Sequence, residues 1–243
     1  MPPKSHYTRF KFEGPFIRGY DAFNHIATVG LDLRWRRKSA TVVVREMRGS
    51  AATLVLDLAC GTGDMARAIA QVAPGARVIG SDPSQTMLFE GRDKLSDWNG
   101  RIAMVRAVGR LPFRDASFAA ITCAFGVRNF IHLEEEMREA LRLLQPGGWI
   151  HVLEFFLPGN WLTRAVLKSY NALVFPFLGF ILTGRIRPYR YLFNSIFTFR
   201  SVPDFTELLQ RTGYGQVRVR RFFFGMVHLV SANKPAASRA SSL

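Results

Sequence analysis

The sequence predicts a single α/β domain with a mostly parallel sheet that carries helices on both faces. Short apolar runs alternate along the chain with stretches whose apolar residues recur at helical spacing. The first apolar run leads directly into a glycine-containing turn and then a helical pattern, which is how a strand-helix-strand unit begins. With 243 residues, 48% of them hydrophobic, the chain can bury a full core.

The elements follow one another along the middle of the chain. Strands are predicted at 54–58, 77–81, 102–106, 118–124 and 149–155, and helices around 65–70, from a Ser84 cap to Leu95, and over 134–144. Pro146 and Gly147 are expected to end the last of these helices. A helix over 202–211 and strands at 217–221 and 226–232 would complete a seven-stranded sheet, with the last two strands as an antiparallel edge pair.

Composition divides this domain, residues 1–243, into five segments. They are an N-terminal helical cover at 1–50, a ligand-binding core at 51–155, a helical and apolar insertion at 156–200 that we expect to lie over the ligand site, a C-terminal helix with two strands at 201–234, and a disordered tail at 235–243. The most apolar run, 172–182, is interrupted by Pro176 and Gly179. Because spanning a bilayer takes about 20 apolar residues, this run is a core helix, an interfacial segment or the wall of an apolar pocket.

The charge is unevenly distributed. The net charge is +15. Residues 1–50 contain 10 basic and 4 acidic side chains, residues 51–154 contain 11 basic and 12 acidic ones, and residues 155–243 contain 12 basic and 2 acidic ones. The last segment also holds 12 of the 21 phenylalanines, a mixture that suits nucleic acid or an anionic membrane surface. The two cysteines cannot form a disulfide framework and the opening residues are polar, so we expect a cytoplasmic protein.

A cofactor site is expected at the turn ACGTGD, residues 59–64. Its glycines let the backbone turn tightly and approach a ligand at the helix N-terminus. Asp82 ends the second strand 19 residues after Gly63, where its carboxylate can accept hydrogen bonds from a ribose diol. The loop also matches the dinucleotide fingerprint GxGxxA, so these residues alone leave nicotinamide and adenosylmethionine cofactors open.

Longer motifs resemble one group of enzymes. A resemblance to the Rossmann-like class I S-adenosylmethionine-dependent methyltransferases is carried by LVLDLACGTGD, SDPSQTML, LPFRDASFAAITCAFGVRN and LRLLQPGGWIHVLEF. Two flanking strings, YDAFNHIATVGLDLRWRR and YRYLFNSIFTF, resemble more narrowly the quinone-biosynthesis C-methyltransferases that act on demethylmenaquinol and on a ubiquinol precursor. This likeness spans residues 16–234 and implies S-adenosylmethionine as the cofactor.

The resemblance assigns the cofactor contacts to residues at the strand ends. The 59–63 backbone and Thr62 would hold the methionine part of the cofactor, and Asp82 its ribose. The full cofactor set is Asp57, Ala59, Gly61, Thr62, Gly63, Asp82, Ala107, Val108 and Ala124. Relatives usually have Asp or Asn, which reads the adenine amino group, at the position of Ala107, and losing one such hydrogen bond costs about 1 kcal/mol.

Methylation of a ring carbon needs an electron-rich ring, and a cation beside a ring hydroxyl favours its anionic form. Arg128 follows the fourth strand, at the edge where such sheets place ligands, and the resemblance points to the same residue. The expected catalytic residues are Arg128, Asn129 and Tyr20, and the expected substrate-binding residues are Asp21, Asn24 and Tyr191. A structural salt bridge or a helix-capping role is the alternative for Arg128.

One C-terminal motif departs from the family pattern G-x-V-A-L-H-x-G. Here the segment reads GMVHLVSA over residues 225–232, with Val230 at the position of the histidine. Neighbouring strand residues face opposite sides, so His228 is not expected to replace it. The departure bears on substrate identity.

Three functions are weighed. We favour methylation of a prenylated quinol by an enzyme bound peripherally to an anionic membrane surface. A nucleic-acid methyltransferase suits the charge, but the fourth strand ends in AFGVRN and not in the Asn/Asp-Pro-Pro-aromatic motif, so no nucleic-acid partner is expected. Ala107 suggests a non-catalytic accessory protein of quinone biosynthesis as a third function. No metal is expected, because histidines, cysteines and carboxylates lack metal-ligand spacing, and a homodimer is left open.

Overall fold

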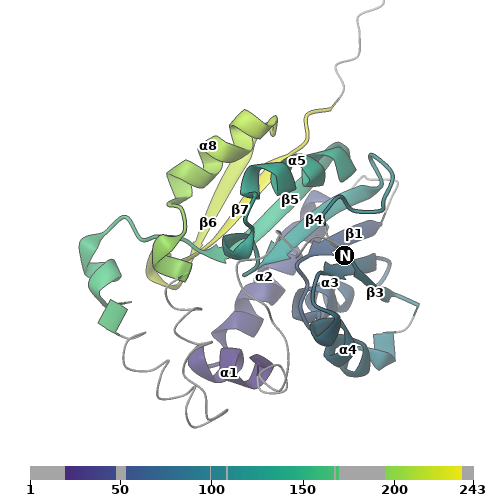
Figure 1. The fold of residues 1–243 in the computed structure, drawn as a ribbon, viewed down its shortest axis with the longest axis horizontal. Coiled ribbons are helices and arrows are strands. Elements are labelled where there is room, and N and C mark those ends of the chain that lie inside the picture. Colours follow the sequence, from purple (N-terminus) through teal and green to yellow (C-terminus); the bar gives the residue numbers. More distant parts are fainter. Residues whose placement is uncertain are drawn as a thin grey trace, which may run out of the picture.

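The computed structural model of the protein describes residues 20–47, 53–98, 100–107, 109–166, 168–169 and 195–236. Its centre is a seven-stranded sheet in the order β3-β2-β1-β4-β5-β7-β6 (Figure 1). The strands are β1 (Leu54–Leu58), β2 (Arg77–Asp82), β3 (Ile102–Arg106), β4 (Phe118–Ala124), β5 (Leu144–Phe155), β6 (Val217–Phe222) and β7 (Val227–Asn233). The pairs among β1 to β5 are parallel, whereas β7 runs antiparallel to β5 and β6, which confirms the predicted fold class.

β5 is longer than the sequence predicts. It begins at Leu144 and not at residue 149, and it follows α5 (Leu133–Leu143) without a loop. Leu144 adopts extended backbone angles (φ −68°, ψ 139°) and pairs with Phe118 of β4. The Pro-Gly pair at 146–147 therefore lies within the strand, next to a register shift in the β4–β5 pairing, and does not end the helix.

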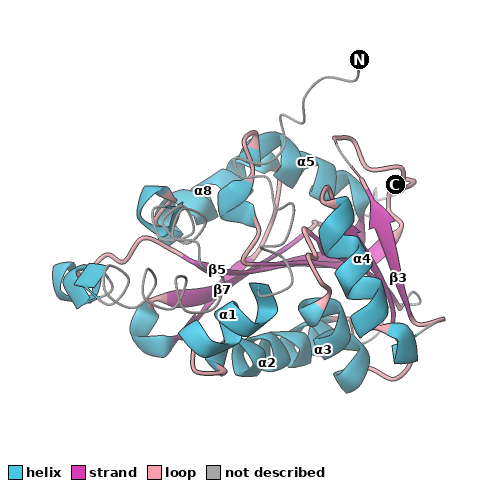
Figure 2. Ribbon diagram, turned by 60° about the horizontal axis from the view of Figure 1, so that its bottom comes forward, coloured by secondary structure: helices cyan, strands magenta, loops and turns pink. Residues whose placement is uncertain are grey.

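Helices α5 and α8 (Val202–Thr212) cover one face of the sheet (Figure 2). Ser201 caps α8 in a reciprocal capping box with Asp204, and Gly213 ends the helix in the left-handed conformation. Both helices direct apolar side chains onto the sheet. The fully buried ones include Met137, Leu143, Phe205 and Leu209, packed with Ile121, Val152 and Val230.

The opposite face is covered by α2 (Leu31–Glu46), α3 (Asp64–Val72) and α4 (Gln85–Lys94). Ala40 and Val43 of α2 are fully buried against α3 and β1, so α2 is part of the core layer. α1 (Tyr20–Ala27) packs on α2, and Figure 2 places α1, α2 and α3 on the same side of the sheet. α1, which belongs to the N-terminal segment expected as a cover, reaches the cofactor loop through the contact of Asp21 with Thr62.

Shorter elements complete the ends of the sheet. A 3-10 turn, η3 (Val127–Asn129), follows β4, and another, η4 (Phe223–Gly225), joins β6 to β7. Within the insertion, residues 161–166 and 195–198 are helical. Val108, the apolar run 172–182, Tyr191 and residues 237–243 lie outside the described residues. Across the described ranges, no helix is long and apolar enough to cross a membrane.

Candidate active site

The loop between β1 and α3 turns on backbone angles that favour glycine. Gly61 and Gly63 have φ values of +57° and +85°, and Ala59 shares the left-handed region at +53°. A Cβ atom at Gly63 would lie 2.5 Å from Cδ1 of Leu95, whereas a Cβ atom at Gly61 would meet no atom within 4 Å. Gly61 therefore faces open space above the ends of the strands, where a ligand can approach the backbone.

Asp82 connects the end of β2 to this loop. Its carboxylate accepts hydrogen bonds from the backbone N of Gly61 (2.9 Å) and of Ser84 (2.8 Å). Burial raises its pKa to about 6, and the two hydrogen bonds oppose that rise. A carboxylate has about four acceptor positions, so two more donors, such as the hydroxyls of a ribose diol, can be accommodated and would favour the ionised form.

Asp57 is completely buried within the sheet. Its carboxylate accepts hydrogen bonds from the backbone N of Ala66 in α3 (3.1 Å) and from the hydroxyl of Thr122 in β4 (2.9 Å). Burial raises its pKa to about 7. Asp57 thus ties β1 to both neighbouring elements directly beneath the cofactor loop.

Two alanines of the expected cofactor set lie at the same edge. The backbone N of Ala107 donates to the carbonyl of Asp82 (3.4 Å), and its side chain packs against the core beneath α5. Ala124 ends β4 and packs against the core clusters on the α2 side of the sheet. The side chain at 107 offers no hydrogen bond to a ligand.

Thr62 is held by the N-terminal helix α1. Its hydroxyl lies 2.8 and 2.9 Å from the two carboxylate oxygens of Asp21. Lys94 of α4 donates to Asp21 (2.7 Å), to Asp64 (2.6 Å) and to Thr62 (3.2 Å). Asp21, expected to contact the substrate, therefore contacts the cofactor loop in this structure, and α1 is fastened to that loop.

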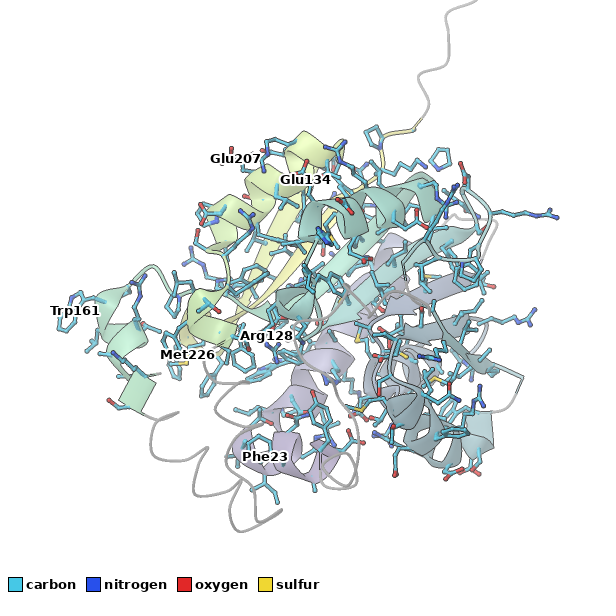
Figure 3. The ribbon with its side chains drawn as sticks, in the orientation of Figure 1. Phe23, Arg128, Glu134, Trp161, Glu207 and Met226 are labelled. Carbon is cyan, nitrogen blue, oxygen red and sulfur yellow. The ribbon has the colours of Figure 1, made fainter. Side chains whose placement is uncertain are left out.

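Arg128 is buried at the carboxyl end of β4, in the middle of the molecule (Figure 3). Its Nη1 donates to Glu154 of β5 (2.5 Å) and to the carbonyl of Phe125 (2.8 Å), and its Nε donates to Ser195 (3.2 Å). Burial raises the pKa of Glu154, and the positive charge of Arg128 opposes this. The structure thus contains the salt bridge that was the alternative for Arg128.

Arg128 also lines a pocket of about 420 Å³. The pocket lies between η3, the start of α5 and residues 198–200, and its lining includes Phe130, Leu133, Phe199 and Arg200. Because the hydrogen bonds of Arg128 use Nε and Nη1, its Nη2 is the nitrogen that the described residues leave for a ligand. A salt bridge and a ligand contact are therefore compatible.

Tyr20 and Asn24 of α1 lie near Arg128. The two side chains are hydrogen-bonded to each other, and burial raises the pKa of Tyr20 against the charges of Arg128 and Arg36. The phenol therefore stays protonated at neutral pH and can donate a hydrogen bond. Asn129 is buried in η3, where its backbone N donates to the carbonyl of Gly126 (2.9 Å).

His228 lies on the side of the sheet that the sequence argument excluded. It is two residues from Val230, so both side chains face α5 and α8, and its ring meets Phe156 edge-on at 5.9 Å. The expectation of opposite sides is therefore wrong. His228 lines a second pocket, of about 690 Å³, together with η4 and residues 157–160.

Sequence reasoning missed three charged residues of this region. Lys94 forms an ion pair with Asp21, and Glu154 forms one with Arg128. The third residue is Arg36 of α2, whose guanidinium lies 4.8 Å from the ring centroid of Phe125. Arg36 stands next to the buried Trp35, and a charged residue beside a core tryptophan was the available signal. Among the described residues, no group of three or more His, Cys, Asp or Glu side chains could hold a metal ion.

A cofactor with a ribose and an amino-acid part fits this edge of the sheet. The open space at Gly61 lies over a loop whose backbone is fixed by Asp82, and the next residue is Thr62, whose hydroxyl is hydrogen-bonded to Asp21 and Lys94. The residues that would hold the cofactor are thus present, except for a polar side chain at 107.

Comparisons with known proteins identify the family of the chain. The model of the ubiE/COQ5 methyltransferase family matches residues 12–234. A demethylmenaquinone methyltransferase of Thermus thermophilus is 36% identical over 217 residues, which cover 89% of this chain and 96% of that protein. A ubiquinone/menaquinone biosynthesis C-methyltransferase, UbiE, of Geobacter sulfurreducens is 35% identical over 219 residues, which cover 88% of this chain and 84% of the relative.

Solved structures are similar in fold. A SAM-dependent methyltransferase from Aquifex aeolicus has a TM-score of 0.56 at 15% identity and covers 80% of this chain and 89% of its own. A protein from Pyrococcus horikoshii has a TM-score of 0.60 at 17% identity and covers 83% and 90%. With the sequence relatives spanning most of both chains, the chain belongs to the ubiE/COQ5 methyltransferase family and is a methyltransferase whose cofactor is S-adenosylmethionine.

Proposed function

We propose that this methyltransferase transfers a methyl group to a ring carbon of a prenylated quinol, a precursor of menaquinone or ubiquinone, at a membrane surface. The names of the relatives support the acceptor class. The observation that carries the proposal is the place of Arg128, which is buried at the end of β4 and borders a pocket with Nη2 left for a ligand. S-adenosylmethionine, when bound, supplies an electrophilic methyl group.

Arg128 acts on the acceptor through its charge. A quinol hydroxyl that approaches Nη2 loses its proton more easily, because the guanidinium stabilises the oxyanion in a site of low dielectric. The resulting electron-rich ring carbon would accept the methyl group as the methyl–sulfur bond of the cofactor breaks, with the electron pair left on the sulfur of S-adenosylhomocysteine. The proton on that ring carbon would then leave to solvent. Glu154 keeps the guanidinium in place through the 2.5 Å contact. The protonated phenol of Tyr20 can donate to a second oxygen of the ring.

An acceptor with a long apolar tail has to be met at a lipid surface, and exposed apolar side chains lie beyond the same end of the sheet. Trp161 is 77% exposed and Phe224 is 89% exposed. We use the name outer apolar patch for five exposed residues: Trp161, Leu162, Val166, Phe223 and Phe224. Arg164, Arg220 and Arg221 are close to these residues in the chain and are exposed. Apolar insertion combined with basic charge suits an anionic headgroup layer.

The acceptor is tested with purified enzyme, labelled S-adenosylmethionine and chemically reduced demethylmenaquinone. Label is expected in the lipid fraction, and label in added RNA would overturn the acceptor class. Arg128→Lys retains a charge beside Glu154 but loses Nη2, so turnover should fall strongly while the affinity for S-adenosylhomocysteine stays near wild type. A second variant, Arg128→Met with Glu154→Leu, removes both charges and leaves no unpaired buried ion.

The pH dependence separates a charge effect from a packing effect. In both Arg128 variants, turnover should recover as the pH rises toward about 10, where a phenolic hydroxyl ionises without help. An unchanged rate at neutral pH in the charge-free double variant would remove Arg128 from the mechanism.

Membrane binding is tested by co-sedimentation with phosphatidylcholine vesicles with and without phosphatidylglycerol. The wild type should bind the anionic vesicles and dissociate with added salt. Trp161→Ser with Phe224→Ser should abolish binding, while Phe89→Ser, a control at a 54% exposed residue of α4, should not. Equal binding of the double variant and the wild type would contradict the assignment of the patch.

A further inference from the structure

Arg36 is a cation whose inner nitrogens have no acceptor. Its Nε and Nη1 are buried, and neither has a hydrogen-bond partner in the part of the chain that the structure describes. The guanidinium lies over the ring of Phe125, 4.8 Å from its centroid. Phe125 is the first residue after β4. An arginine can only donate, so these two N–H groups require an acceptor from elsewhere.

The place of Arg36 is set by the helix and not by a partner of its own. α2 is fixed by buried side chains on either side of it, including Trp35, Ala40 and Val43. Burying unsatisfied donors of a charged group is costly, and such groups normally find partners inside a protein. Arg36 therefore lies against Phe125, directly after β4, with its Nε and Nη1 lacking an acceptor among the described residues.

The charge of Arg36 reaches the cofactor loop. Burial works to raise the pKa of Asp64, yet the charges of Arg36 and Lys94 outweigh it and lower the pKa. Burial also raises the pKa of Asp57, and Arg36 opposes that rise. Arg36 is thus close to the start of α3 and to β1, on the α2 side of the sheet.

The nearby carboxylates already have partners. Asp64 contacts Lys94 and Arg67, and Asp21 contacts Thr62 and Lys94. None of them makes an ion pair with Arg36, although each lies at the same loop. Among the described residues the inner nitrogens of Arg36 thus have no carboxylate acceptor, and an anion brought by a ligand can fill that place.

We propose that Arg36 binds the carboxylate of the methionine part of S-adenosylmethionine. That carboxylate is the one anionic group of the cofactor, and a guanidinium is the side chain best shaped to bind it through two parallel hydrogen bonds. The inference rests on the cofactor of the family and not on the proposed acceptor. Its failure would leave the acceptor proposal standing, because every measurement below is made without an acceptor.

Calorimetric titration with two ligands tests the assignment. Decarboxylated S-adenosylmethionine differs from the cofactor only by the missing carboxylate. Wild type should bind the intact cofactor about 10- to 100-fold more tightly, as expected for hydrogen bonds between charged groups. Arg36→Gln should weaken binding of the intact cofactor by that factor and change binding of the decarboxylated ligand less than about twofold. Arg37→Gln, at the next and exposed residue of α2, is the matched control.

The stability of the unliganded variant provides a second readout. Arg36→Gln should melt at or above the wild-type temperature, because it removes a half-buried cation whose inner nitrogens lack an acceptor. If Arg36 instead stabilised the fold, Arg36→Gln would melt below the wild-type temperature. The proposal is overturned if Arg36→Gln weakens both ligands equally, or if it leaves binding of the intact cofactor unchanged.

Discussion

Replacing Glu154 by glutamine should destabilise the protein far more than the same change at Glu134. Each carboxylate pairs with an arginine at nearly the same distance, 2.5 Å for Glu154–Arg128 and 2.6 Å for Glu134–Arg138. The first pair is buried, with side chains 0% and 4% exposed, and the second is on the surface of α5, with side chains 42% and 58% exposed. Burial is therefore the main difference between the two changes.

The structure gives the expected size of the effect. Glu154 accepts hydrogen bonds from Nη1 and the backbone N of Arg128 and from the backbone N of Phe155. Glutamine would turn an NH2 group toward one of these donors and leave the guanidinium without its counter-charge. Breaking a buried ion pair in this way costs about 3–5 kcal/mol, and an exposed helical pair is worth about 0.3–0.5 kcal/mol.

Urea unfolding at equilibrium and thermal melting of both variants measure the difference. For a chain of this length, about 2–4 °C is lost per kcal/mol, so Glu154→Gln should melt about 6–20 °C below the wild type and Glu134→Gln within about 2 °C of it. The double variant Arg128→Met with Glu154→Leu should regain most of the lost stability, because no buried charge is left unpaired. Equal losses for Glu154→Gln and Glu134→Gln would refute the reasoning.

Three further outcomes follow from the site. Gly61→Ala should cost only the strain of a left-handed alanine, about 1–2 kcal/mol, and weaken cofactor binding in calorimetry. Gly63→Ala should cost more stability, because its Cβ would lie 2.5 Å from Cδ1 of Leu95, a side chain that is buried in the core and has to move. If the two glycine variants melt alike, the steric argument fails. Burial raises the pKa of Asp57 to about 7, so the folded protein keeps a proton that the unfolded chain loses near 3.8. As the pH rises from about 3.8 to about 7, the free energy of unfolding should therefore fall by up to about 1.4 kcal/mol per pH unit. Asp57→Asn should remove that pH dependence in denaturant titrations. An unchanged pH dependence would contradict the shifted pKa. Cys123 is completely buried, and burial raises the pKa of its thiol, so a maleimide at pH 7 should not label it before unfolding, and rapid labelling would show that this thiol is accessible.

The order of the elements and the edge that carries the site could be predicted from the sequence. Periodicity and turn chemistry are local properties, so the strand at 54–58, the glycine loop and the Ser84 cap lie where they were predicted. The start of β5 was the exception, because the Pro-Gly pair suggests a helix stop while pairing with β4 extends the strand through it. Pairing with a distant strand here outweighed a local signal.

The sequence by itself determined which charged residues stand at the strand ends, and only the tertiary structure decided how they pair. The partner of Arg128 is 26 residues away on the next strand of the sheet, and Asp21 meets Thr62 across 41 residues because α1 folds back onto the cofactor loop. Whether Arg36 has an acceptor depends on how α2 packs against β4 and α3, three elements that are separated in the chain. Such contacts follow from sheet order and helix packing, which no local pattern of residues specifies.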